Sequence, residues 1–223
     1  MALEVCVRLA AASASAAALV ALVVSGKASV NYALVGLAAV SAVENLAALG
    51  GRLTPEVYAG FEVLLAWLAA VAALEIGHEA WRPIGLEERR VWGRILRAAC
   101  LQMGAVAALG LAGAAIVPEG DRWGYRGLAC ATAGALAFVV CVREGLAGRR
   151  RLASPLGDAA LAWLPLYLGA QVAYLLAWEL SRGLALALAV PVAALQVGAM
   201  LSLAWAAFGG ASGRAGRAVA DAR

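Results

Sequence analysis

Long apolar runs separated by short polar segments make up almost the whole chain. A helix needs about 20 mostly apolar residues to cross the hydrocarbon core of a membrane, and seven runs of suitable length fit in the sequence. These runs are residues 5–24, 30–49, 55–74, 95–117, 127–142, 157–178 and 183–208. The pattern therefore predicts an all-α, polytopic membrane protein: a bundle of seven transmembrane helices within residues 1–208, followed by a short basic cytoplasmic tail at 209–223.

The first run has a second interpretation as a secretory signal peptide, because small residues follow it at 25–29. Glu4 offsets the nearby charge of Arg8, and Lys27 follows the run, which favours a helix that is retained. Both interpretations stay open from the sequence.

Capping residues and prolines indicate where some of the helices begin or bend. Thr54, Pro55 and Glu56 combine an N-cap, a first-turn proline and a first-turn acid, so the third helix is predicted to begin there. Pro165 and Pro191 lie inside the last two runs, where the missing amide proton permits a kink. We expect a kink in each of these helices.

The composition excludes an ordinary soluble domain. Of the 223 residues, 64% are hydrophobic and 14% are charged, whereas about a quarter are charged in soluble proteins. The net charge of +4 could suggest a nucleic-acid partner, but the basic residues flank the apolar runs, as they do beside membranes. We therefore expect the lipid bilayer as a partner and no nucleic acid.

The basic residues also predict an orientation. Thirteen of the 18 Lys and Arg residues fall on one side of the alternating connections and five on the other. The larger group consists of Lys27, Arg82, Arg89, Arg90, Arg94, Arg97, Arg143, Arg149, Arg150, Arg151, Arg214, Arg217 and Arg223. Because cytoplasmic loops carry the excess of positive charge, the N-terminus is predicted outside and the C-terminus in the cytoplasm.

Two acidic residues lie within the predicted spans, where ionisable groups are costly and usually functional. Glu44 near the end of the second helix and Glu62 near the start of the third are expected at similar depth, because a tight loop joins the helices. With Asn45, Tyr58 and Arg52 nearby, they would form a polar pocket that shares a proton or holds a cation. The alternative is that each carboxylate hydrogen-bonds a neighbouring helix and fixes its packing.

A second polar group lies at the cytoplasmic end of the third helix. Glu75, His78, Glu79 and Arg82 share one face at helical spacing. An interfacial cluster of salt bridges is the main interpretation, and proton sensing by His78 is the alternative. His78 is the single histidine of the chain, which argues against bis-histidine haem and a symmetrical di-metal site.

The sixth helix carries an ordered stripe of aromatic residues and one amide. Its members lie within about 80 degrees of arc and are Trp163, Tyr167, Gln171, Tyr174 and Trp178. Such a stripe could line a groove for a lipid, quinone or pigment. The alternative is a surface that packs on lipid or on another helix.

The sequence lacks residues that several known activities of membrane proteins require. A retinal Schiff base needs a lysine in the last helix, but the single lysine is Lys27 in the first loop. An intramembrane serine protease needs a base within the bundle, and His78 lies at the membrane edge. The four cysteines form no CxxC pair, so a zinc site is not expected. No motif implies a cofactor.

Short motifs stand at both ends of the third helix, namely Tyr58, Glu62, Glu75, Ile76, Trp81 and Pro83. Through these motifs residues 30–97 resemble a group of uncharacterised bacterial seven-helix membrane proteins and, in topology, the membrane sensor domains of some histidine kinases. The resemblance implies a bacterial inner-membrane location and favours a protein without enzyme activity.

Taken together, these features predict a non-enzymatic bacterial inner-membrane module, either sensor-like or an accessory subunit of a larger membrane assembly. One alternative is a carrier or binder of a small hydrophobic molecule that uses the aromatic stripe. Another is a proton- or cation-coupled transporter that uses Glu44 and Glu62.

Overall fold

The computed structural model describes residues 2–26, 31–51, 55–81, 122–148 and 155–220, with Leu101 and Ala105. These residues form the helices α1 (Ala2–Val24), α2 (Tyr32–Leu49), α3 (Pro55–Trp81), α5 (Arg122–Gly148), α6 (Pro155–Leu180) and α7 (Arg182–Ala220). The all-α prediction is confirmed for this part of the chain. Apart from Leu101 and Ala105, the expected helix at 95–117 lies outside the described residues, so the count of seven helices stays a prediction.

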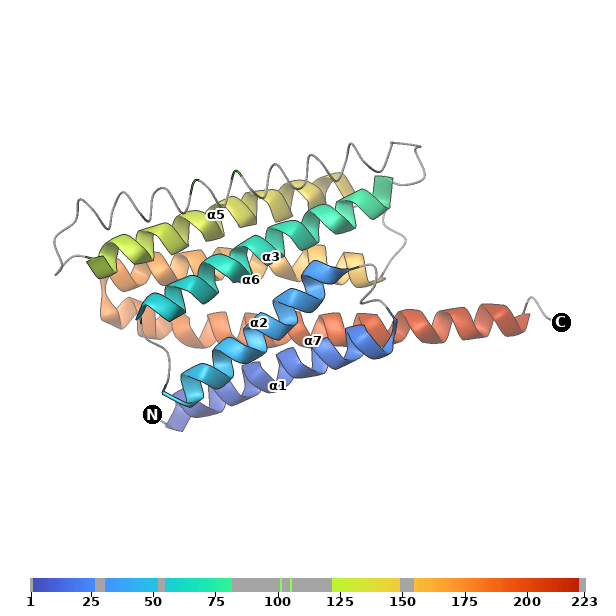
Figure 1. The fold of residues 1–223 in the computed structure, drawn as a ribbon, viewed down its shortest axis with the longest axis horizontal. Coiled ribbons are helices and arrows are strands. Elements are labelled where there is room, and N and C mark those ends of the chain that lie inside the picture. Colours follow the sequence, from blue (N-terminus) through green and yellow to red (C-terminus); the bar gives the residue numbers. More distant parts are fainter. Residues whose placement is uncertain are drawn as a thin grey trace.

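The six helices lie side by side and form a closed ring. Each packs against the next along the chain, and α7 returns to pack against α1, while α3 also touches α6 across the middle. Figure 1 shows that α1, α3, α5 and α7 end at the same end of the bundle, and that α2 and α6 run the opposite way. The N-terminus and the C-terminus therefore lie at opposite ends of the molecule.

Two thiol hydrogen bonds show the direction of α5 relative to α3. The Cys130 thiol donates to the carbonyl oxygen of Ala59 over 3.7 Å, and the Cys141 thiol donates to that of Ala69 over 3.6 Å. Because both helices advance in the same sense between these contacts, α3 and α5 are parallel neighbours. The end of α3 and the start of α5 consequently lie at opposite ends of the bundle (Figure 1).

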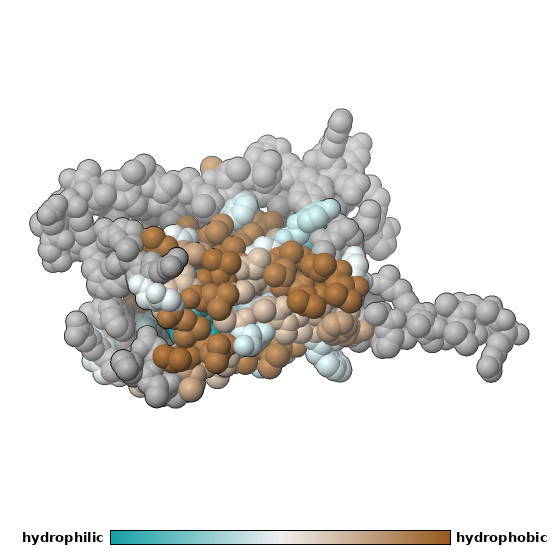
Figure 2. Space-filling view, turned by 60° about the horizontal axis from the view of Figure 1, so that its bottom comes forward, coloured by the Kyte–Doolittle hydropathy of each residue, from teal (hydrophilic) through white to brown (hydrophobic). Residues whose placement is uncertain are grey.

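Five of these helices are long and apolar enough to cross a membrane. Their apolar segments are Val5–Val24, Tyr32–Leu49, Val57–Ile76, Pro155–Ala177 and Ala187–Phe208. Large apolar side chains such as Trp205 and Leu9 are exposed, and Figure 2 shows broad apolar patches on one face of the described surface. Exposed apolar and buried polar side chains are the arrangement that lipid as solvent requires, so the chain is a helical membrane protein.

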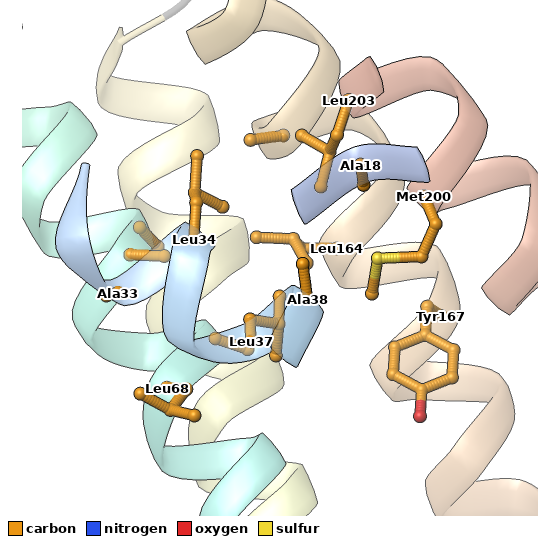
Figure 3. Close-up of a cluster of buried hydrophobic side chains, with 14 of the residues drawn as sticks. Ala18, Ala33, Leu34, Leu37, Ala38, Leu68, Leu164, Tyr167, Met200 and Leu203 are labelled. Atoms are coloured by element: carbon orange, nitrogen blue, oxygen red, sulfur yellow. The ribbon is translucent and has the colours of Figure 1, made fainter. Parts of the chain in front are cut away.

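The core is built largely from alanine and leucine, with Tyr167 and Met200 among its larger members (Figure 3). Small residues let the helices approach closely, as membrane helices do when the hydrophobic effect no longer drives their association. A Cβ atom added to Gly36 would lie 3.1 Å from Leu68, and one added to Gly198 would lie 3.2 Å from the Trp163 ring.

Several helices are longer than hydropathy alone indicates. α3 continues to Trp81 instead of residue 74, α5 covers Arg122–Gly148 instead of 127–142, and α7 continues to Ala220. A helix ends where its backbone hydrogen bonding ends, and charged residues beyond the hydrocarbon region remain compatible with it. Pro165 and Pro191 do lie inside helices, as expected. Both helices run unbroken through them, and the kinks stay a prediction.

Candidate functional site

Polar side chains gather in the interior of the bundle rather than on its surface. Among the described residues, the buried polar or charged side chains are Ser15, Asn31, Ser41, Glu44, Asn45, Glu62, Glu75, Gln171 and Gln196. Most of them belong to one hydrogen-bonded network that joins α1, α2 and α7, or to a second group that joins α3 and α6. Buried polar groups in a membrane are costly unless they are paired, so this interior is the candidate site.

Arg8 of α1 faces the acidic residue of α2. Its Nη1 atom lies 3.7 Å from Oε1 of Glu44, and the two side chains are 28% and 3% exposed. The same nitrogen donates to Oδ1 of Asn45 over 3.4 Å. Arg8 therefore supplies the positive charge that a buried carboxylate needs.

Ser41 is the centre of the first network. Its hydroxyl shares a 2.9 Å hydrogen bond with the Ser15 hydroxyl and accepts another of 2.9 Å from the Gln196 side-chain amide. The Asn45 amide donates to the backbone oxygen of Ser41 over 2.8 Å. These bonds tie α1, α2 and α7 together at a position where lipid could not satisfy the same groups.

Glu62 of α3 is the centre of the second group. Its Oε1 atom accepts a 2.7 Å hydrogen bond from the Gln171 amide of α6, and its carboxylate also accepts one from the Tyr58 hydroxyl. Glu44 lies near enough for the charges of the two carboxylates to interact. Two acids, one guanidinium and several neutral donors thus share one region of the interior.

The structure brings together four of the five residues expected in the polar pocket: Glu44, Asn45, Tyr58 and Glu62. The fifth, Arg52, lies outside the described residues. Whether these residues act as a functional site stays a prediction.

The sequence interpretation did not assign Arg8 or Gln171 to this site. The sequence pattern places Arg8 near the start of the first apolar run and Gln171 in the aromatic stripe. An arginine one turn inside an apolar run is the signal that could have indicated a buried acidic partner.

The aromatic stripe of α6 faces the interior of the bundle. Trp163 packs against Gly198 of α7, Tyr167 is buried in the core, and Gln171 hydrogen-bonds Glu62. Tyr174 packs against the same core, while the Trp178 side chain lies outside the described part. These contacts favour helix packing over a ligand groove, and a bound hydrophobic molecule stays a prediction.

Glu75 is buried, and the expected interfacial cluster around it stays a prediction. Its Oε2 atom accepts a 3.2 Å hydrogen bond from the backbone N–H of Ala33 in the first turn of α2. The N-cap residue Asn31 makes no side-chain capping bond, so Glu75 caps the neighbouring helix from a distance. The side chains of His78 and Glu79, and all of Arg82, lie outside the described residues.

One further acid lies beyond the expected fifth span. Burial raises the pKa of the Glu144 carboxyl above its ordinary value, although the charge of Arg143 acts in the opposite direction. The two side chains form an ion pair with an N–O distance of 3.9 Å. The Arg143 side chain is 80% exposed, so the pair is expected to contribute little stability.

No protein family, curated protein or solved structure matches the chain. The five apolar helices and the buried polar interior define the chain as a helical membrane protein. The resemblance of residues 30–97 to bacterial sensor-like proteins stays a prediction.

Proposed function

We propose that the chain is a non-enzymatic module of the bacterial cytoplasmic membrane, either sensor-like or an accessory subunit of a larger membrane assembly. In this proposal the bundle has seven spans, with the N-terminus outside and the C-terminus inside. Two observations support the topology. α3 and α5 are parallel neighbours, and the apolar run at 95–117 between them is long enough to cross back.

The unbroken extension of α7 beyond its apolar segment is the observation that supports the functional proposal. This helix has 39 residues, of which Ala187–Phe208 is the apolar segment, and it extends past the end of its neighbours (Figure 1). The part of the helix after Phe208, residues 209–220, adds about 18 Å at 1.5 Å per residue and includes Arg214 and Arg217 in its sequence. A helix that continues from the bundle into the cytoplasm gives the module a means of contact with a cytoplasmic or membrane partner.

Purification in mild detergent tests this proposal. The full chain is expected to retain a specific partner that is lost when the chain is cut after residue 209. The double variant Arg214→Lys and Arg217→Lys is the matched control, because it keeps the length and charge of the extension and should keep the partner. A chain that purifies alone from native membranes in every form, and shows turnover, would rule the proposal out.

Proton- or cation-coupled transport is a second candidate, favoured by the burial of both Glu44 and Glu62 and by the guanidinium of Arg8 beside Glu44. Membrane proteins that move protons commonly use such interior acids. The double variant Glu44→Gln and Glu62→Gln should abolish proton or cation flux into liposomes. Glu144→Gln, at the end of α5, should leave flux unchanged, and flux that survives the double variant excludes this candidate.

A further inference from the structure

A small cavity lies beside Glu62, between α3, α5 and α6. Its volume is about 10 Å³, and its polar lining includes Glu62, Gln171 and Tyr167. A volume of this size accommodates a single water molecule, which usually needs two to four polar partners. The cavity has the size and the lining for one such molecule and is too small for an organic ligand.

The Tyr167 hydroxyl makes no hydrogen bond to the described residues. The side chain is 5% exposed, and within the described part of the chain no hydrogen bond to its hydroxyl is present. Figure 3 shows the hydroxyl pointing away from the labelled apolar cluster. The hydroxyl is not fully enclosed, because the fully buried side-chain atom without a partner in the described part of the chain is Nε1 of Trp67. A water in the cavity can therefore reach the Tyr167 hydroxyl and bond it.

The charges around Glu62 do not balance. Arg8 on α1 lies 3.7 Å from Glu44 on α2, which leaves the second carboxylate without a cation of its own among the described residues. The other titratable groups facing Glu62 are Tyr58 on its own helix, Tyr167 on α6 and Cys130 on α5. All three are neutral at pH 7 in their ordinary forms, and an uncompensated charge inside a membrane protein is costly.

We propose that this cavity is an internal proton-binding site, in which one water joins Glu62 to Tyr167 and Gln171 and Glu62 carries the proton. The proton comes from the aqueous phase and adds to the Glu62 carboxylate. The new O–H donates to the water, and the water donates to the Gln171 amide oxygen and the Tyr167 hydroxyl. Arg8 keeps Glu44 as its ion-pair partner, so a proton on Glu62 removes the need for a second cation.

Proton binding at Glu62 does not depend on the function proposed above, because it requires neither a partner protein nor transport. The test is therefore made on the purified full chain in lipid nanodiscs, by infrared difference spectroscopy between neutral and alkaline pH. The carbonyl stretch of a protonated carboxyl is expected in the wild type and lost in Glu62→Gln. Glu75→Gln is the matched control for another buried acid and should keep the band.

Two further variants keep the test decisive if Glu62→Gln fails to fold. Tyr167→Phe removes only the hydroxyl and should shift the carbonyl band, because the water loses one of its partners. Glu44→Gln frees Arg8 to compensate Glu62, so the neutral-pH band should disappear. A wild-type spectrum without the band, or a band at the same position in Tyr167→Phe, overturns the proposal.

Discussion

Arg8 is the residue on which the electrostatics of the described interior depend. Its guanidinium is close to Glu44 and Asn45 and is only partly exposed, so it offsets a charge that lipid would not solvate. Breaking one partner of a buried ion pair is more damaging than removing both, because the surviving charge remains buried.

Arg8→Gln is expected to lower the free energy of unfolding by about 1–3 kcal/mol, less than for a fully buried pair because the side chain is 28% exposed. The double variant Arg8→Gln and Glu44→Gln should recover part of that loss, since it removes the orphaned charge. Thermal unfolding in detergent measures the stability of the single and the double variant. Losses that simply add in the double variant would show that the two side chains do not interact.

Ser41→Ala tests the centre of the first network. It removes a hydroxyl that bonds Ser15 and Gln196, and we expect a loss of about 1 kcal/mol, typical of hydrogen bonds between membrane helices. Ser13→Ala is the control, because Ser13 is exposed on the same helix as Ser15. Equal stability of the two variants in the unfolding measurement would contradict the role given to Ser41.

At the level of single residues, the sequence predicted part of the polar site. Glu44 and Glu62 could be placed together because a short loop joins their helices. Arg8 and Gln171 could not, since their contacts with these acids cross 36 and 109 positions in the chain respectively. Such contacts depend on how the helices pack, and a linear pattern does not contain that information.

The helices themselves are positioned by polar caps and by glycines at close contacts. Glu75 of α3 supplies an acceptor to the start of α2, where the positive end of the helix dipole favours a carboxylate. Hydropathy located the six described helices approximately but gave no indication of this contact, because helical spacing places Glu75 on an interfacial polar face.

Replacing Glu75 tests this cap. Glu75→Ala should destabilise α2 by about 1 kcal/mol, whereas Glu75→Gln retains an acceptor and should cost less. Hydrogen exchange at the amide of Ala33, which donates to Glu75, provides the local measurement. Unchanged protection of that amide in Glu75→Ala would contradict the capping role.

Gly134 sets the distance between α5 and α6. A Cβ atom at this position would lie 2.8 Å from Cγ2 of Val172, so Gly134→Ala should force the helices apart and cost about 1–3 kcal/mol. Gly60→Ala is the control, because nothing lies within 4 Å of its Cβ position. Val172→Ala should rescue stability in the Gly134→Ala background, and failure of that rescue would indicate another cause.

For the whole molecule, the ring of α1, α2, α3, α5, α6 and α7 joins elements from both ends of the chain. Apolar periodicity predicted the class and the approximate helices, because the bilayer demands long apolar segments. It could not predict that α7 closes the ring against α1, or that α7 continues to Ala220. Closure depends on complementary small side chains, and the helix end depends on backbone hydrogen bonding.

The central proposal is that the chain crosses the membrane an odd number of times and that its basic connections lie in the cytoplasm. Paired reporters on the two termini of the full chain test it most directly, using one enzyme that is active only outside the membrane and one fluorophore that matures only inside. The account predicts activity of the outside reporter at the N-terminus and fluorescence at the C-terminus. Signals that place both termini in the same compartment would contradict it.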